Sequence, residues 1–205
     1  MAGRHPKQLG ATLVELVVAS ALVLLIMGEL WMLLQTGTRF YLRSRAQSDV
    51  QRHALIALRG MSTDLAEGAP LSFKHYDPDN PSITTDRNGF VFGSPKDANE
   101  AASYNEEGRL LWTSVIGYYI DPASKDLIRA KILLDEPKES APQILDELYH
   151  ISLMEAASNR RMVAQDAYDI ETVQGPQDIQ VTLRFRDEDL GFGLKIQTRL
   201  EMKNK

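Results

Sequence analysis

The stretch of sequence that decides the fold is GATLVELVVASALVLLIMGELWMLL, which runs from Gly10 to Leu34. It follows a short polar leader, MAGRHPKQLG, that carries Arg4 and Lys7. The apolar part, residues 11–34, has 24 residues. Because about 20 apolar residues in a helix are enough to cross a bilayer core of roughly 30 Å, this stretch predicts a transmembrane helix.

One acidic residue, Glu15, lies near the start of this helix. A carboxylate inside a membrane span is costly, so an acid there is a candidate functional residue. Glu15 is about 6 Å along the axis from Ala11 at a rise of about 1.5 Å per residue. At that depth its side chain can reach lipid headgroups or a cation. A boundary acid without a specific role remains the alternative.

The residues around Glu15 resemble the processing site of type IV prepilins and type II secretion pseudopilins. The usual family pattern after a short basic leader is G-F-T-L-I-E-L, and this chain has G-A-T-L-V-E-L, with Ala11 where Phe is usual. The resemblance implies that a prepilin peptidase cuts between Gly10 and Ala11 on the cytoplasmic side. It also implies that the new Ala11 amine is N-methylated and that Glu15 neutralises the terminal amine of a neighbouring subunit during assembly.

Two other interpretations of the apolar stretch stay open. Ala19-Ser20-Ala21 matches the small-residue pattern of a secretory cleavage site, although the apolar run continues well past it. The stretch could also be an uncleaved signal anchor of a bitopic periplasmic sensor or scaffold protein. The charges do not orient the span, because Arg4 and Lys7 precede it and further arginines, at 39, 43 and 45, follow it. The resemblance places the N-terminus in the cytoplasm.

The helix is predicted to continue beyond the membrane. Apolar residues recur at steps of three or four, as expected for one face of a helix: Leu42, Ala46, Val50, Ala54, Leu58, Met61 and Leu65. We therefore expect one helix over residues 11–66, with its second half packed against a folded domain. Glu29 is expected to extend to the membrane surface, while an ion pair with a neighbouring subunit remains an alternative.

Residues 67–205 are predicted to form a β-rich head. Gly68 and Pro70 are typical of a helix end. GFVFG at residues 89–93 is a short strand, and residues 110–120 and 127–134 form a hairpin around a polar turn. Residues 179–186 and 192–202 alternate apolar and polar side chains and form a second hairpin. The expected fold is α+β: a leader over 1–10, a long helix, and an antiparallel head that resembles the larger minor pilins of the W and J types.

Composition and motifs favour a structural subunit over an enzyme. The net charge is −5, which argues against general nucleic-acid binding, and there are no cysteines to form disulfides or thiolate metal sites. The four histidines are scattered, and no zinc-protease, nucleophile-elbow or P-loop motif is present. The acidic clusters at residues 77–80 and 187–189 lack the spacing of a calcium loop and are interpreted as solvated turns. No catalytic residue, metal or cofactor is expected.

The resemblance implies a single-pass inner-membrane protein whose head is periplasmic and which later joins a pilus or pseudopilus. The implied partners are the prepilin peptidase, other pilins or pseudopilins, an inner-membrane assembly platform and the lipid bilayer. A type IV pilus, type II secretion and DNA uptake stay open as the machine that the subunit serves.

Overall fold

The computed structural model describes residues 12–76, 88–141, 151–175, 178–187 and 192–202. The chain divides into two compact units, Met1–Arg45 and Ala46–Lys205. A single 55-residue helix, α1 (Leu13–Glu67), supplies the described part of the first unit and the opening segment of the second. The helix therefore begins and ends within two residues of the bounds that the sequence predicts.

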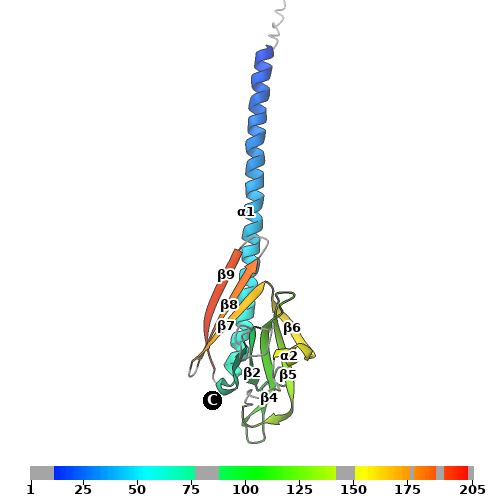
Figure 1. The fold of residues 1–205 in the computed structure, drawn as a ribbon, viewed down its shortest axis with the longest axis vertical. Coiled ribbons are helices and arrows are strands. Elements are labelled where there is room, and N and C mark those ends of the chain that lie inside the picture. The colour runs from blue at the N-terminus through cyan, green and yellow to red at the C-terminus, as the bar shows by residue number, and fades with distance from the viewer. Residues whose placement is uncertain (1–11, 77–87, 142–150, 176–177, 188–191, 203–205) are drawn as a thin grey trace, which may run out of the picture. The chain divides into compact units, whose positions relative to one another are not determined.

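The second unit contains a larger antiparallel sheet with the strand order β1-β2-β4-β5-β6 and with β3 paired to β4. Strands β2, β4, β5 and β6 of this sheet are labelled in Figure 1. Its strands are β1 (Lys74–Tyr76), β2 (Gly89–Ser94), β3 (Ser103–Tyr104), β4 (Leu110–Ile120), β5 (Leu127–Lys138) and β6 (Asn159–Ala164). The expected hairpin is present as β4 and β5, in which Ile120 pairs with Leu127. The 3-10 turn η1 (Pro70–Ser72) leads into this sheet, and the short helix α2 (Ile151–Ala156) precedes β6.

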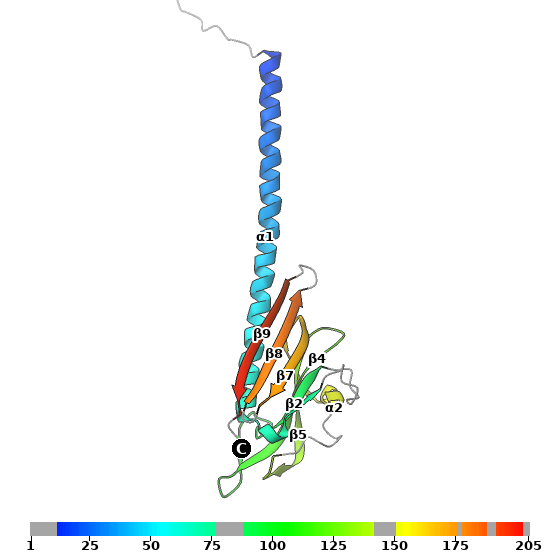
Figure 2. The ribbon, with the colours of Figure 1, turned by 60° about the vertical axis from the view of Figure 1, so that its left-hand side comes forward.

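The remaining strands form a separate antiparallel sheet in the order β7-β8-β9, visible side by side in Figure 2. They are β7 (Ala167–Gln174), β8 (Asp178–Asp187) and β9 (Phe192–Glu201). The expected C-terminal hairpin is β8 and β9, in continuous register from Asp178 opposite Glu201 to Asp187 opposite Phe192. The described residues thus form an α+β unit with a long N-terminal helix and antiparallel sheets.

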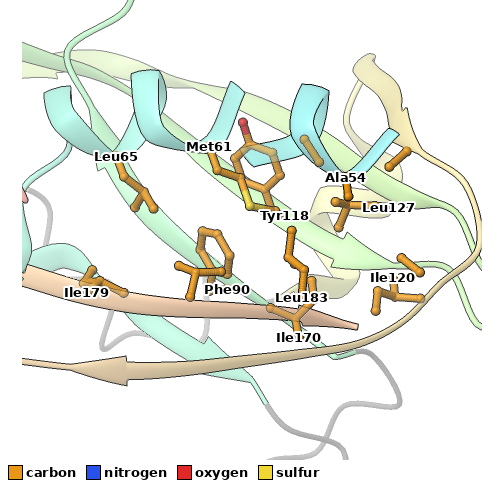
Figure 3. Packing of buried hydrophobic residues seen from close by; sticks show 14 of the residues in the cluster. Ala54, Met61, Leu65, Phe90, Tyr118, Ile120, Leu127, Ile170, Ile179 and Leu183 are labelled. Atoms are coloured by element: carbon orange, nitrogen blue, oxygen red, sulfur yellow. The ribbon is translucent and has the colours of Figure 1, made fainter. Parts of the chain in front are cut away.

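One hydrophobic core joins the second half of α1 to both sheets. Ala54, Met61 and Leu65 point from the helix toward Phe90 and Tyr118 of the larger sheet, with the β7-β8-β9 sheet across from them (Figure 3). The predicted stripe is largely confirmed, because Val50, Ala54, Met61 and Leu65 are buried. Three of its members differ: Leu42 is exposed, and Ala46 and Leu58 are only partly buried. Ala57, outside the stripe, is fully buried. Its small side chain permits close packing between the helix and the rest of the core.

Gly68 ends α1 at a point of close approach. Its N–H donates to the Leu65 carbonyl at 3.0 Å, and a Cβ atom at this position would lie 2.7 Å from Cδ2 of Phe92. A side chain here would therefore displace a buried aromatic ring of the core. The opposite face of the larger sheet carries a second, smaller core, where Met154 of α2 packs with Val91, Val115 and Ala130.

The helix contribution to the core leads to a testable expectation. A chain that begins at Gln35 should unfold in one cooperative transition, because it keeps the buried face of α1. A chain that begins at Pro70 should be insoluble or lack a cooperative melt, since both sheets would lose the apolar face that covers them. Calorimetry of the two proteins measures the difference. Equally sharp transitions would show that α1 is not part of the core.

Candidate functional site

The first unit exposes an almost continuous apolar surface. The large apolar side chains from Leu13 to Leu34 are between 53% and 80% exposed. The helix is long and apolar enough to cross a membrane and lies near the N-terminus. Such a large apolar surface is not stable in water, so it requires lipid or other protein around it.

Glu15 lies in the first turn of this helix and makes a reciprocal contact with Thr12. The Thr12 N–H donates to Oε2 of Glu15 at 2.8 Å, and the Glu15 N–H donates to Oγ1 of Thr12 at 3.4 Å. This is a capping-box arrangement, in which each side chain satisfies a backbone donor left free at the helix start. Glu15 therefore has a local role in starting the helix, which sequence reasoning did not predict.

The structure describes only some of the other residues that the sequence singled out. Gly10 and Ala11, the residues on either side of the expected cleavage point, lie outside the described residues. Glu29 and Trp31 are both exposed on α1, and Trp31 is 70% exposed. The structure therefore brings Glu15 to the edge of the described helix, directly after the segment that carries the expected processing site.

The second unit holds a buried charge cluster that sequence reasoning missed. At its centre is Asp64 on α1, which is 3% exposed. Its Oδ2 accepts hydrogen bonds from Nε of Arg129 and from the Tyr118 hydroxyl, both at 2.6 Å. Its Oδ1 accepts a hydrogen bond from Nζ of Lys96 at 2.9 Å. The carboxylate thereby ties the end of the helix to β4, to β5 and to the segment after β2.

Glu100 forms an outer layer of the same Asp64 cluster. Its two carboxylate oxygens accept from the guanidinium of Arg129 at 3.1 and 3.2 Å, and Lys131 lies 3.3 Å from one of them. Glu100 has a φ of 63°, in the left-handed region that side chains other than glycine seldom adopt. The bidentate contact with Arg129 offsets this conformational cost. Arg129, 1% exposed, is thus held between two carboxylates.

The charges of the cluster shift the pKa values of its members. Burial by itself would raise the pKa of the Asp64 carboxyl, but hydrogen bonds from Arg129 and Tyr118 outweigh burial and lower it. Burial, reinforced by the Asp64 carboxylate, raises the pKa of Tyr118 well above its usual value. Burial lowers the pKa of Lys131, and the contact with Glu100 offsets only part of that effect. Asp64 is therefore ionised, and Tyr118 neutral, at neutral pH.

The lowered pKa of Asp64 gives its contribution to stability a defined pH dependence. A group whose pKa is lower in the folded state stabilises the fold above its unfolded pKa of about 3.9 and loses that effect as the pH falls. The difference in the free energy of unfolding between the wild type and Asp64→Asn should be constant between about pH 5 and pH 8 and should shrink below about pH 4. Urea titrations across this range measure it. A difference that grows on acidification would contradict the assignment.

No metal site was expected, and none of the described residues form a group of three or more His, Asp or Glu side chains arranged to hold a metal. His75 contacts the Ile170 carbonyl through Nε2 at 3.2 Å, and His53 lies partly buried on α1. Residues 77–80 and 188–189, from the two acidic clusters, lie outside the described residues. Each charged side chain of the Asp64 cluster has an oppositely charged partner within it, as expected for a cluster that holds the helix and the sheet together.

Comparison of the chain with models of protein families, with curated proteins and with solved structures gives no match.

Proposed function

We propose that this chain is a minor pilin or type II secretion pseudopilin, a structural subunit that is stored in the inner membrane and added to a filament through its N-terminal helix. The observation that carries the proposal is the exposed apolar half of α1, which has an acid, Glu15, in its first turn and within the G-A-T-L-V-E-L sequence. In a filament subunit, the apolar surface of such a helix is covered at both stages. Lipid surrounds the helix before assembly, and the helices of neighbouring subunits surround it afterwards.

The proposed mechanism is association, with no catalytic step. A prepilin peptidase removes residues 1–10, and the Ala11 amine is N-methylated and keeps its positive charge. Glu15 of one subunit then meets the Ala11 amine of the next in surroundings of low dielectric constant, where an ion pair is stronger than in water. The pairing sets the axial register of the subunits. The partners are the peptidase, other pilins or pseudopilins and an inner-membrane assembly platform, and the head lies in the periplasm.

The α+β architecture with a long N-terminal helix is the second support for the proposal. The second half of α1 forms part of the core of an α+β unit with antiparallel sheets, which is the organisation that a pilin head requires. The Asp64 cluster adds a polar tie between that helix and the sheets. A subunit that is pulled from a bilayer by its helix would need such a tie, because the force would act on the contact between helix and head.

Co-expression with a prepilin peptidase tests the proposal. The full chain should lose its leader and migrate faster on electrophoresis, and Gly10→Val, which places a branched side chain at the cleavage point, should not. An unchanged mobility of the wild-type chain would favour an uncleaved signal anchor. A larger decrease in mass, together with release of the rest of the chain from the membrane, would instead indicate secretory cleavage after Ala21.

A further inference from the structure

A basic and aromatic segment follows the apolar stretch of α1. Arg39, Phe40, Tyr41 and Arg43 are all exposed in the first unit, and the two aromatic side chains are 75% and 64% exposed. Within the described residues neither Arg39 nor Arg43 has an ion-pair partner, whereas Arg129 of the second unit is fully paired. Two arginines without internal partners, beside two exposed aromatic rings, indicate a surface that contacts something outside the chain.

The spacing of the two arginines suits a single anionic group. Residues four apart lie on the same face of a helix, with Cβ atoms about 5–6 Å apart. Two guanidinium groups at that separation can donate to one phosphate from two sides, and arginine is the side chain best suited to bidentate phosphate contacts. At 3.6 residues per turn, Phe40 lies next to this face and Tyr41 on the opposite side of the helix. A tyrosine ring, which has one polar end, is typical of a membrane interface.

The position along the helix decides which anion these arginines meet. At a rise of about 1.5 Å per residue, Arg39 lies about 7.5 Å beyond Leu34 and Arg43 about 13.5 Å beyond it. A headgroup layer extends about 5–8 Å beyond each side of the hydrocarbon core. Arginine side chains are long enough to bend back toward that layer. Both guanidinium groups can therefore reach lipid phosphates when the apolar stretch is inside a bilayer.

We propose that Arg39 and Arg43 bind the phosphate of an anionic phospholipid and hold this segment of α1 at the membrane surface. The inference rests on the proposed function, because it requires that the apolar stretch be inside a bilayer. It goes beyond that function in assigning a lipid class and two binding residues. A nucleic acid fits the charge of the two arginines but not the adjoining apolar span, nor the net charge of −5.

The test reconstitutes the full chain in vesicles of phosphatidylcholine that contain a trace of spin-labelled lipid. The relative association constants of labelled phosphatidylglycerol and labelled phosphatidylcholine are measured from the motionally restricted fraction. Arg39 and Arg43 together should contribute a preference for phosphatidylglycerol of about 25-fold, since each basic residue near a membrane surface contributes about 1 kcal/mol, about fivefold. High salt should reduce this preference by screening.

The matched variants carry equal changes in charge. Arg39→Gln/Arg43→Gln should remove the contribution of these two arginines and leave only what Arg4 and Lys7 of the leader contribute, while Arg52→Gln/Arg59→Gln, exposed positions further along the same helix, should retain the wild-type preference. If the wild type enters the vesicles but does not prefer phosphatidylglycerol, this inference alone is overturned. An equal loss of that preference in both double variants would have the same consequence. A wild-type chain that does not enter the vesicles would overturn the proposed membrane span and this inference with it.

Discussion

Replacing Asp64 with alanine is expected to lower the free energy of unfolding of the second unit by about 3–5 kcal/mol, since removing one member of a buried ion pair leaves its partner uncompensated. Arg129 would keep Glu100 but lose the carboxylate on α1 at 2.6 Å, and the buried Tyr118 hydroxyl would lose its acceptor. Urea denaturation of the chain that begins at Gln35 measures the change. A loss below about 1 kcal/mol would show that the cluster does not hold the helix on the sheets.

Two control variants separate the cluster from other effects. Asp49→Ala changes an exposed carboxylate that has a partner at the protein surface, so we expect a change of about 1 kcal/mol or less. The double variant Asp64→Leu/Arg129→Met removes both members of the central pair and should cost less than Asp64→Ala alone, because no unpaired charge remains at the centre. If the double variant is the less stable of the two, packing rather than charge compensation explains the loss.

Glu15→Ala is expected to leave membrane insertion and leader removal intact and to reduce incorporation into filaments by about a hundredfold. The substitution makes the span more apolar, and the expected scissile bond between Gly10 and Ala11 is outside the altered side chain. In the filament, however, the cationic Ala11 amine would lose its partner where water is excluded. Removing one member of a buried ion pair costs at least about 3 kcal/mol, which corresponds to about a hundredfold in the association constant. The measurement is the fraction of processed protein recovered in sheared filaments or cross-linked to neighbouring pilins.

The contact between Glu15 and Thr12 makes a second variant necessary. Thr12→Ala removes the hydroxyl of the capping box but keeps the carboxylate, so it tests whether fraying of the helix start alone impairs assembly. We expect nearly normal incorporation for Thr12→Ala. Glu15→Gln should be intermediate, since an amide accepts a hydrogen bond but carries no charge. If Thr12→Ala and Glu15→Ala were equally impaired, Glu15 would serve as a helix cap and not as an assembly contact.

Local periodicity predicted the elements whose apolar faces repeat without interruption. The stripe that contains Val50, Ala54 and Leu65 repeats over several turns of α1, and the strands of the β8-β9 hairpin alternate along their whole length. Such patterns depend only on which face is buried, so a sequence shows them directly. The β4-β5 hairpin was predictable for a related reason, because a polar turn separates two apolar runs.

The division into two sheets was not predictable, because it depends on contacts between residues far apart in the sequence. At the edge of β7 that faces away from β8, the contacts come from side chains of other segments and not from a paired strand. Nε2 of His75 contacts the Ile170 carbonyl at 3.2 Å, and Asn88 donates to Oδ1 of Asp169 at 2.7 Å. Strand β6, with the sequence NRRMVA, has too short and too polar a pattern to predict a strand.

The Asp64 cluster was missed because burial of a charge is invisible until its partners are known. Two signals were present in the sequence. Asp64 lies between Met61 and Leu65 on the apolar stripe, and Arg129 and Lys131 alternate with Ile128 and Ala130 in β5. In a sheet covered on both faces, such charges must be buried and therefore paired. A charge on a predicted core face is thus a usable signal for a buried ion pair.

We propose that the chain is processed as a prepilin, and the mass of its N-terminus tests this proposal most directly. The protein is extracted from the membranes of cells that have an active prepilin peptidase, and its terminal peptide is identified by mass spectrometry. We expect an N-methylated Ala11 as the first residue, with Gly10 the last residue removed. A membrane protein that still begins at Met1 in those cells would contradict it.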